Sequence, residues 1–416
     1  MGEIRDLAGA FWRGEVDPRT LWTPTGKREE LVPGLWFLHT FANISALRTG
    51  EGLVLIDTSN YAARDKTFAA VRAIDTGPLR TAIYTHGHAD HACGLPPFLA
   101  EARARGWTRP SIVGHANVAR RFDRYRFTNG WNGVINARQF GIPPAWPMDY
   151  DYPDTAYDDR LDVTAGDLRL ELHHARGETD DHTWIWWPAS RVLFTGDLFI
   201  WVAPNAGNPQ KVQRYAAEWA VALRAMVACE PEVLVPGHGV PIFGAERVRQ
   251  ALEDTASWLE HLVGETVARM NAGATLEDIL QAVRPPAHLA GRPYLHAVYD
   301  EPDFVVRNVW RLYGGWWDGA PARLKPASDA AIGREVAALA GGLDALIARA
   351  RAVAAAGDLA LAGHLIDWVV AAEPRRRDAH AVRAEIYTAR AAESAALMTR
   401  AIFSAAARDS SERAGA

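Results

Sequence analysis

Short apolar runs separated by glycine, proline and polar residues recur along the first half of the chain. Runs of this kind predict buried strands. We expect strands at 34–38, 44–48, 52–57, 82–84, 111–113, 162–164, 168–172, 183–187 and 233–235. Phe68, Val71 and Ile74 recur at helical spacing, which predicts an amphipathic helix over 62–74. A second helix is expected to begin near Leu95.

The last part of the chain has a different pattern. Residues 330–408 are rich in alanine and predict helices rather than strands. Segments 357–374 and 378–389 are typical of helix–turn–helix units, similar to a tetratricopeptide pair. We therefore expect a helical region after the strand-rich part.

Composition narrows the class of protein. The chain has 416 residues, of which 49% are hydrophobic, enough for more than one domain. A formal net charge of −5 gives no overall basic field, so we expect no nucleic-acid partner. Only Cys93 and Cys229 are present, too few for a disulfide framework, which suits a reducing compartment.

The sequence contains no signal for export or membrane insertion. The N-terminus has neither a basic stretch nor an apolar stretch typical of a signal peptide. No run of about 18 apolar residues occurs, so we expect no membrane span. Together with the two cysteines, this predicts a cytoplasmic protein.

The candidate chemistry is concentrated after the strand at 82–84. His86, His88, Asp90 and His91 fall within six residues. On extended backbone, side chains two residues apart share a face, so His86 and His88 can point together. Imidazole and carboxylate are ligands preferred by zinc and similar metals. A polar turn with incidental histidines is the alternative, but four such groups this close favour a metal site.

The spacing His-x-His-x-Asp-His after an apolar strand resembles the signature of the metallo-β-lactamase fold. The resemblance implies an α/β fold, an αββα sandwich with a two-metal site at one edge. It also implies that His86 and His88 hold one metal, whereas Asp90 and His91 hold the other.

Later parts of the chain supply the remaining ligands that the resemblance requires. Glu178 occupies the position where most members of the superfamily carry a histidine. Asp197, in a strand over 191–199, matches the residue that bridges both metals, and His238 matches the last ligand of the second metal. The implied cofactor is a pair of zinc or similar divalent ions. Asp57 is implied to orient a ligand histidine, with a strand-end cap as the alternative.

Glutamate at position 178 is the pattern of the zinc-dependent alkyl sulfatases of this fold. Segments 273–279 and 307–321 resemble the dimerisation region of that family. The resemblance implies a catalytic domain over 1–245, a helical dimerisation domain over 246–416 with tetratricopeptide-like helices at about 345–408, and a homodimer. Long members carry a further lipid-carrier-like domain, which we do not expect here.

The sulfate-contact motifs of well-known alkyl sulfatases are not found after Asp197, so the substrate contacts need other residues. Amide and cationic donors suit the oxygens of an anionic ester. An aromatic and cationic insert at 118–147 adds further donors. The alternative is that this insert is a solvated helix with its arginines on the outer face. The candidates for contact with a small anionic ester are Asn205, Asn208, Lys211, Arg214, Tyr125, Arg126, Asn129 and Arg138.

The resemblance leads to a mechanistic hypothesis with Asp90, Asp197 and His182 as catalytic residues. A metal-bridging hydroxide would attack the sulfate ester of an alcohol. His182 is a candidate general acid, although its place before a strand also suits packing. A phosphoester, lactone or amide hydrolase on the same scaffold is the alternative, and a helical dimer with an inactive sandwich is the non-enzymatic one. Trp316 and Trp317 could fill a core or line a substrate entrance.

Overall fold

The computed structural model describes residues 2–415, which form two compact units. The first unit runs to Asn129 and continues over Trp146–Ala274 and Ile279–Tyr313. The second unit comprises Gly130–Ala145, Thr275–Asp278 and the chain from Gly314 onward. The predicted domain division at 245/246 stays a prediction.

Two sheets make up the centre of the first unit. The first sheet has the strand order β1-β2-β3-β4-β5-β6-β7; it is antiparallel up to β4 and parallel from β4 to β7. Its strands are β1 (Arg28–Val32), β2 (Leu35–Leu38), β3 (Ile44–Thr49), β4 (Gly52–Ile56), β5 (Leu79–Ile83), β6 (Ser111–His115) and β7 (Thr155–Tyr157). The parallel strands all end at the same edge, where β5 leads into the histidine motif.

The second sheet has the order β13-β12-β11-β10-β9-β8, and among its pairs only β11 and β12 run parallel. Its strands are β8 (Arg160–Ala165), β9 (Leu168–Ala175), β10 (His182–Trp187), β11 (Val192–Ile200), β12 (Val233–His238) and β13 (Ile242–Phe243). Because β11 and β12 are parallel, residues beyond Gly196 and at His238 come to the same edge of this sheet.

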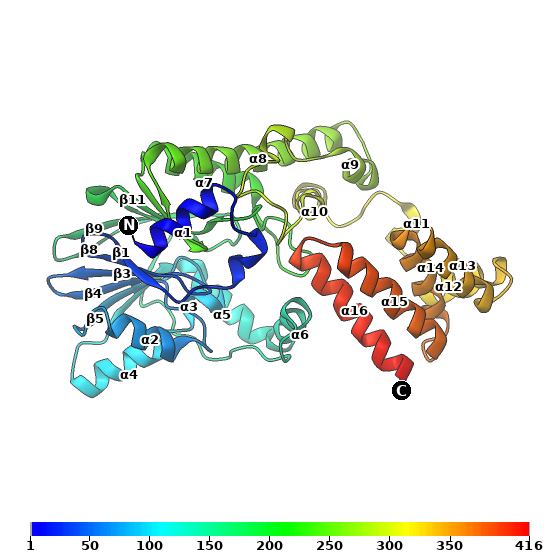
Figure 1. Ribbon diagram of the computed structural model, residues 1–416, viewed down its shortest axis with the longest axis horizontal. Coiled ribbons are helices and arrows are strands. Elements are labelled where there is room, and N and C mark those ends of the chain that lie inside the picture. The colour runs from blue at the N-terminus through cyan, green and yellow to red at the C-terminus, as the bar shows by residue number, and fades with distance from the viewer. Residues whose placement is uncertain (1, 416) are drawn as a thin grey trace. The chain divides into compact units, whose positions relative to one another are not determined.

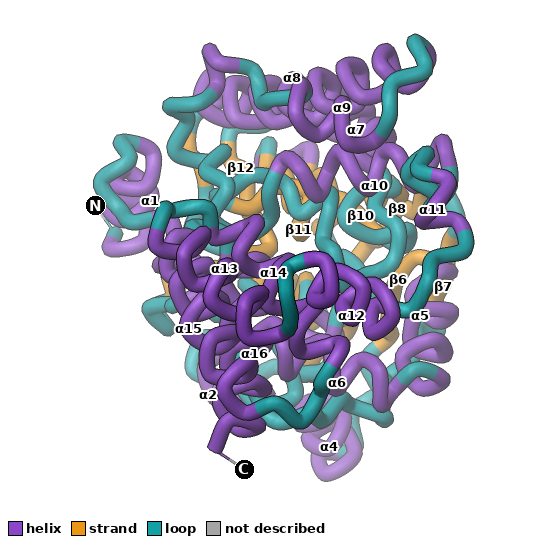
Figure 2. The backbone as a smooth tube through the Cα atoms, turned by 90° about the vertical axis from the view of Figure 1, so that its right-hand side faces the viewer, coloured by secondary structure: helices purple, strands orange, loops and turns teal. Residues whose placement is uncertain are grey.

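The two sheets pack face to face and are covered by helices on their outer sides (Figure 1). Side chains such as Phe37, Val54, Leu172 and Phe194 from both sheets form one buried cluster between them. A second cluster lies between the first sheet and α2 (Arg64–Arg72), α4 (Pro96–Arg105) and α5 (Ala116–Phe127). On the other side, α7 (Ala216–Ala228) packs against the second sheet and against α8 (Ala245–Asn271). The predicted αββα sandwich is confirmed, and Figure 2 shows its strands between these helix layers.

The strands expected from apolar runs are all present within a few residues, as is the helix expected over 62–74. The strands that were not expected are β1, β7 and β13. β1 reads Arg-Glu-Glu-Leu-Val and lies at a sheet edge, so its solvent-facing side chains interrupt the apolar pattern. β7 and β13 are edge strands of three and two residues, too short to produce a pattern.

Six helices of the second unit follow one another along the chain and continue the alanine-rich pattern. They are α11 (Pro321–Leu324), α12 (Asp329–Leu339), α13 (Leu343–Ala355), α14 (Leu359–Ala372), α15 (Arg377–Glu393) and α16 (Leu397–Gly415). Leu346, Ile366 and Val382 are among the buried side chains that form the common core of α12 to α15. The helices predicted over 357–374 and 378–389 are confirmed as α14 and α15.

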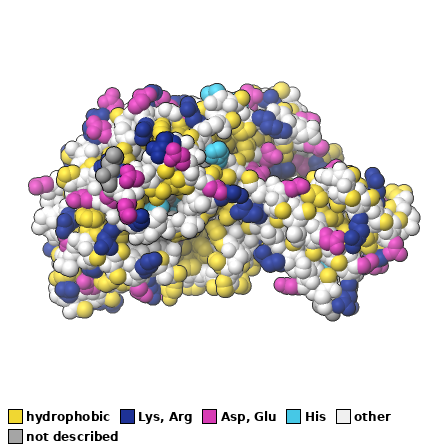
Figure 3. Space-filling model, in the orientation of Figure 1, with side chains coloured by type: hydrophobic (Ala, Val, Ile, Leu, Met, Phe, Trp, Pro, Cys, Tyr) yellow, Lys and Arg dark blue, Asp and Glu magenta, His cyan; other side chains and the backbone are white. Residues whose placement is uncertain are grey.

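Shorter elements complete the description. They are α1 (Glu3–Trp12), η1 (Pro18–Trp22), α3 (Ala89–Ala92), α6 (Asn129–Phe140), η2 (Pro188–Ser190), α9 (Leu276–Ala282), η3 (Ala287–Leu289) and α10 (Pro302–Gly314). Within residues 2–415, no helix is long and apolar enough to cross a membrane. Basic and acidic side chains are interspersed over the face drawn in Figure 3. Trp316 and Trp317 are 70% and 38% exposed, so the core alternative for them is wrong.

Candidate metal centre

The candidate ligands come from the ends of strands in both sheets. His86 and His88 follow β5, and the short helix α3 then carries Asp90 and His91. In the second sheet, Glu178 lies in the connection from β9 to β10, Asp197 lies in β11, and His238 ends β12. Gly196, just before Asp197, has φ +50° and lies so close to His182 Nε2 that a Cβ there would be 2.6 Å from it. Glycine therefore allows β11 to turn and present Asp197.

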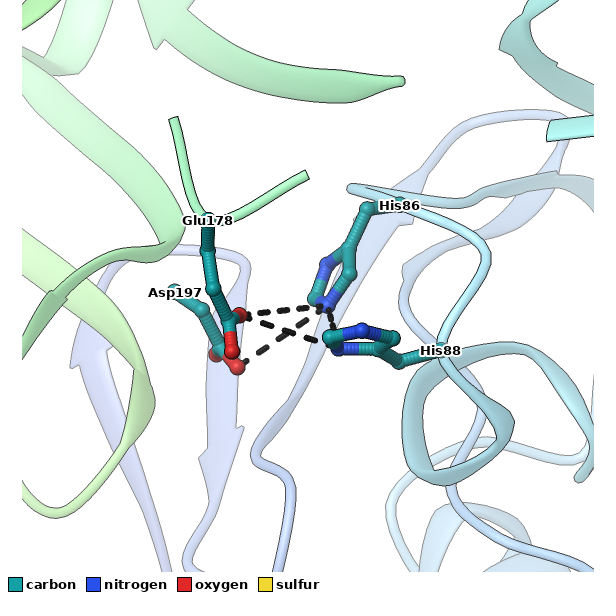
Figure 4. A group of neighbouring side chains, drawn as sticks. All are labelled: His86, His88, Glu178 and Asp197. Carbon is teal, nitrogen blue, oxygen red and sulfur yellow. Dashed lines mark hydrogen bonds and ion pairs between the residues drawn. The ribbon is translucent and has the colours of Figure 1, made fainter. Parts of the chain in front are cut away.

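Four of these side chains converge in one group, which Figure 4 shows (His86, His88, Glu178 and Asp197). His86 Nε2 lies 2.8 Å from His88 Nδ1, 3.9 Å from Glu178 Oε2 and 3.8 Å from Asp197 Oδ2. His88 Nδ1 lies 3.7 Å from Glu178 Oε2. Ligand atoms of a tetrahedral zinc site, each about 2.0–2.1 Å from the ion, are about 3.3 Å apart. Most of the observed distances exceed this value only slightly.

A second group comprises Asp90, His91 and His238. His238 Nε2 lies 3.5 Å from Asp90 Oδ2, and His91 Nε2 lies 3.7 Å from the same oxygen. Asp197 connects this group with the first, because its Oδ1 is 3.4 Å from His91 Nε2 and its Oδ2 is 3.4 Å from His238 Nε2. A carboxylate in this position can contact ions in both groups.

Hydrogen bonds set the direction of three of the imidazoles. Asp57 Oδ2 accepts a hydrogen bond from His91 Nδ1 at 2.7 Å and another from Thr85 Oγ1 at 2.8 Å. Thr85 Oγ1 in turn lies 3.1 Å from Nδ1 of His86, and the carbonyl of Phe41 accepts from Nδ1 of His238. With their Nδ1 atoms engaged, all three rings present Nε2 to the centre, where it is available to a metal.

The electrostatics of the centre suit a cation. Burial lowers the pKa values of His86 and His88 well below the usual value, so both rings are neutral and able to donate a lone pair. Burial also raises the pKa of Glu178 to about 7. His91 Nε2, Glu178 Oε2 and Asp197 Oδ1 are buried without a hydrogen-bond partner. Unsatisfied buried atoms of this kind are costly, and a divalent ion would satisfy all three.

Two of the candidate substrate contacts have partners inside the centre. Asn205 Nδ2 donates to Glu178 Oε1 at 2.5 Å, and Arg214 Nη1 donates to the Glu178 carbonyl and lies 3.2 Å from Oε1. Both residues are buried. They therefore hold the Glu178 carboxylate in place.

Two further candidates lie in the loop between Asn205 and Arg214. Asn208 is buried, and its Nδ2 has no hydrogen-bond partner. The pKa of Lys211 is lowered to about 7 because of burial and because of the nearby Arg214 guanidinium. Asp300 anchors this loop, since its Oδ2 accepts from the backbone N–H groups of Gly207 at 2.6 Å and Asn208 at 3.2 Å.

The candidates in the insert lie on α5 and α6. Tyr125 is buried in the cluster beside the first sheet, Arg126 is exposed, and Asn129 donates to the carbonyl of Trp146 at 2.9 Å. Arg138 lies on α6 in the second unit. As substrate contacts, these four residues stay predictions.

The prediction of His182 as a general acid needs correction. Its Nε2 accepts a hydrogen bond from the backbone N–H of Asp197 at 3.1 Å, and its ring stacks on His86 with centroids 4.4 Å apart. Burial lowers the pKa of His182 to about 4. An imidazole that accepts at Nε2 holds no proton there to donate, so His182 positions Asp197 and His86 instead.

Residues that the sequence analysis did not identify support the loop that carries His86 and His88. The backbone N–H of Gly87 donates to Asp181 Oδ2 at 3.0 Å, and the same oxygen accepts from Arg121 Nε at 2.8 Å. Arg121 also pairs with Asp180 at 2.5 Å, and both Arg121 and Asp181 are fully buried. No local pattern marks these contacts, because they join residues 59 to 94 positions apart in the chain.

Comparison with known families matches two parts of the chain. Residues 39–238 match the model of the metallo-beta-lactamase superfamily. Residues 275–413 match the model of the alkyl sulfatase dimerisation family. The first match contains all seven candidate ligands, and the second contains most of the C-terminal helices.

Similar proteins are named alkylsulfatases. A linear primary-alkylsulfatase of Pseudomonas sp. (strain ATCC 19151) is 29% identical over 348 residues, which is 78% of this chain and 63% of that protein. An (R)-specific secondary-alkylsulfatase of Pseudomonas sp. is 26% identical over 392 residues, 86% of this chain and 58% of that protein. The chain thus spans about three fifths of the length of these relatives.

A solved structure has the same fold over nearly the whole chain. The stereoselective inverting sec-alkylsulfatase Pisa1 from Pseudomonas sp. aligns with a TM-score of 0.83, covering 98% of this chain and 70% of that one. The sequence identity is 22%, so this likeness establishes the architecture and nothing further.

Proposed function

We propose that the chain is a metal-dependent hydrolase of alkyl sulfate esters, because residues 39–238 match the metallo-beta-lactamase superfamily and residues 275–413 match the alkyl sulfatase dimerisation family. The observation that carries the proposal is the convergence of seven side chains in two groups joined by Asp197. The names of the relatives at 29% and 26% identity supply the ester class.

The cofactor in this proposal is a pair of zinc or similar divalent ions. The first group would hold one ion and the second group the other, with Asp197 contacting both. When bound, such ions lower the pKa of water toward neutrality and so provide a nucleophile without a serine or cysteine. The oriented imidazoles of His86 and His91 and the unpartnered carboxylate oxygens support this assignment.

Glu178 gives the first group a charge that a histidine would not. Two carboxylates, Glu178 and Asp197, then lie near the same position, and the Arg214 guanidinium offsets part of their negative charge. Asn205 donates a hydrogen bond to the same carboxylate oxygen, Glu178 Oε1. We infer that Asn205 and Arg214 act on the ligand Glu178, and that they do not bind the substrate directly.

The anionic part of the ester needs a hydrogen-bond donor and a positive charge. Asn208 and Lys211 lie in the same anchored loop as Asn205, and Asn208 Nδ2 is buried without a partner. An approaching anion favours the charged form of Lys211, whose pKa is lowered to about 7. We therefore assign Asn208 and Lys211 to recognition of the sulfate group.

A homodimer is part of the proposal. The second unit carries the match to the alkyl sulfatase dimerisation family and exposes several large apolar side chains. They include Trp131, Phe140, Ile142 and Trp316. A partner can cover exposed apolar side chains of this kind, and the family match favours a second copy as that partner.

The test is a substrate panel with the zinc-loaded protein. Release of inorganic sulfate from primary and secondary alkyl sulfates supports the proposal, and a phosphodiester, a lactone and an amide are measured on the same plate. Turnover of one of those three with no sulfate release would contradict the proposed ester class. It would leave the metal centre in use for a different substrate.

A further inference from the structure

Two aromatic side chains from separate parts of the chain pack on His238, and a third packs on one of these two. Trp22 ends η1, Phe41 lies between β2 and β3, and Tyr299 precedes α10. The rings of Trp22 and Phe41 meet the His238 ring edge-to-face, with centroids 5.2 Å and 5.4 Å away. Trp22 also lies 4.5 Å from Tyr299 and 5.9 Å from Phe41. We call Trp22, Phe41 and Tyr299 the aromatic wall.

The aromatic wall does not serve as core. Each of its three side chains is only half buried, whereas His238 beneath them is almost completely buried. Among the residues that the structure describes, the buried clusters of the sandwich include none of the three. Half-buried aromatic side chains beside a polar centre are typical of ligand sites, where apolar walls surround a few polar groups.

The two halves of the metal centre therefore have different surroundings. The ligand Glu178 is surrounded by the amide of Asn205 and the guanidinium of Arg214. His238 faces the aromatic wall instead. The rings of Trp22 and Phe41 contact the His238 ring directly. The wall thus adjoins the centre itself.

We infer that the aromatic wall binds the apolar alcohol part of the ester and sets the preference for its size. This inference rests on the proposed function, because it assigns the second half of the same substrate. The anionic group of the ester lies toward Asn208 and Lys211, and the carbon chain or ring lies on Trp22 and Phe41. Trp22 belongs to η1, in the N-terminal segment that precedes the matched residues 39–238.

The apolar area that the ligand buries on the aromatic wall predicts how its affinity depends on its size. Each methylene that moves from water onto an apolar surface strengthens binding by about three- to fourfold. The affinity for a series of ligands with the same anionic group should therefore rise with chain length until the wall is covered. Aromatic rings gain further through edge-to-face contact.

The experiment uses alkanesulfonates, whose carbon–sulfur bond is not an ester and is not hydrolysed. Isothermal titration calorimetry measures their affinity for the zinc-loaded full chain, from ethane- to hexanesulfonate and with benzenesulfonate. We expect about a three- to fourfold gain per methylene for the wild type. For Trp22→Ala and Phe41→Ala the gain should fall below twofold, with metal content unchanged. Tyr61→Ala, which removes a ring that is 56% exposed elsewhere in the first unit, is the matched control.

The outcomes separate this inference from the proposed function. Chain-length dependence that is lost in Trp22→Ala supports the wall even if no sulfate ester is hydrolysed. Sulfate ester turnover with the same chain-length dependence in wild type, Trp22→Ala and Phe41→Ala would overturn the wall and leave the function standing. If the alanine variants lose metal, Trp22→Phe replaces them in the experiment, because it keeps a smaller aromatic ring against His238. A reduced gain per methylene in Trp22→Phe supports the wall, and an unchanged gain overturns it.

Discussion

Asp57 Oδ2 lies 2.7 Å from Nδ1 of His91, and this contact turns Nε2 of the imidazole toward Asp90 and Asp197. The same carboxylate accepts from the hydroxyl and the backbone N–H of Thr85. Through Thr85 it also reaches Nδ1 of His86. One buried carboxylate thus orients a candidate ligand in each of the two groups.

Replacement of Asp57 tests this arrangement. Asp57→Asn should lower zinc affinity by about 10- to 100-fold, because the amide cannot accept from both neighbours and fix both imidazoles. Asparagine tolerates the left-handed backbone that Asp57 adopts at φ +58°, so the fold should be retained. Competition with a chromophoric chelator measures the affinity. Asp65→Asn, an exposed carboxylate on α2, is the control, and equal affinity in both variants would show that Asp57 has no orienting role.

The pairing of Arg214 with Glu178 predicts a stability that depends on metal. Arg214→Met leaves the Glu178 carboxylate buried without its cation, which should lower the free energy of unfolding of the metal-free protein by about 3 kcal/mol. Bound metal should restore part of the loss, since it supplies positive charge to the same carboxylate. Urea unfolding with and without zinc measures both values. An equal loss in the two states would contradict the assignment of Glu178 as a ligand.

The buried pair of Arg121 and Asp181 should stabilise the loop that carries His86 and His88. Asp181→Asn should lower the free energy of unfolding by about 3–5 kcal/mol, because it leaves the buried guanidinium with only its contact to Asp180. Arg160→Gln, at an exposed ion pair, should cost less than about 1 kcal/mol.

The difference in free energy of unfolding between the wild type and Asp181→Asn depends on pH through the pKa of Asp181. Burial opposes ionisation, but the Arg121 guanidinium outweighs it and lowers the pKa to about 2. Since the pKa is lower in the folded protein than the usual value of about 3.9, the stabilisation is complete above that value and is lost as pH falls toward 2. The difference between wild type and Asp181→Asn should therefore be constant from about pH 5 to 8 in urea unfolding. A difference that shrinks across this range would mean that Asp181 is protonated in the folded state.

The exposed apolar side chains of the second unit are expected to lie in the dimer interface. The double variant Trp131→Ser, Trp316→Ser should shift the protein from dimer to monomer in light scattering coupled to size-exclusion chromatography. Each side chain exposes more than half of its area in a single chain, and polar replacement removes the apolar surface that a second copy would cover. Tyr61→Ser in the first unit should remain a dimer. A monomeric wild type would contradict the homodimer directly.

The sandwich was predictable because apolar runs and turn residues alternate clearly along the first half of the chain. The seven candidate ligands were predicted for a different reason: four lie within six residues, and the resemblance to the metallo-β-lactamase fold implies the other three. Thr85, Arg121 and Asp181 could not be found in this way, since a hydroxyl or an ion pair gains its meaning only when distant segments meet. The role of His182 was predicted wrongly because sequence cannot show that the backbone N–H of Asp197 occupies its Nε2. The cytoplasmic location stays a prediction.

The most direct test of the account is sulfate release from an alkyl sulfate by zinc-loaded wild type, Glu178→Ala and Asp197→Ala, with bound metal measured in the same samples. We expect turnover in the wild type with about two metal ions per chain. Both variants should lose metal and at least about 100-fold of the activity, while circular dichroism remains unchanged. Asp65→Ala should behave as the wild type. Retained turnover in Asp197→Ala with intact folding would contradict the claim that these two groups of side chains, joined by Asp197, form the active centre.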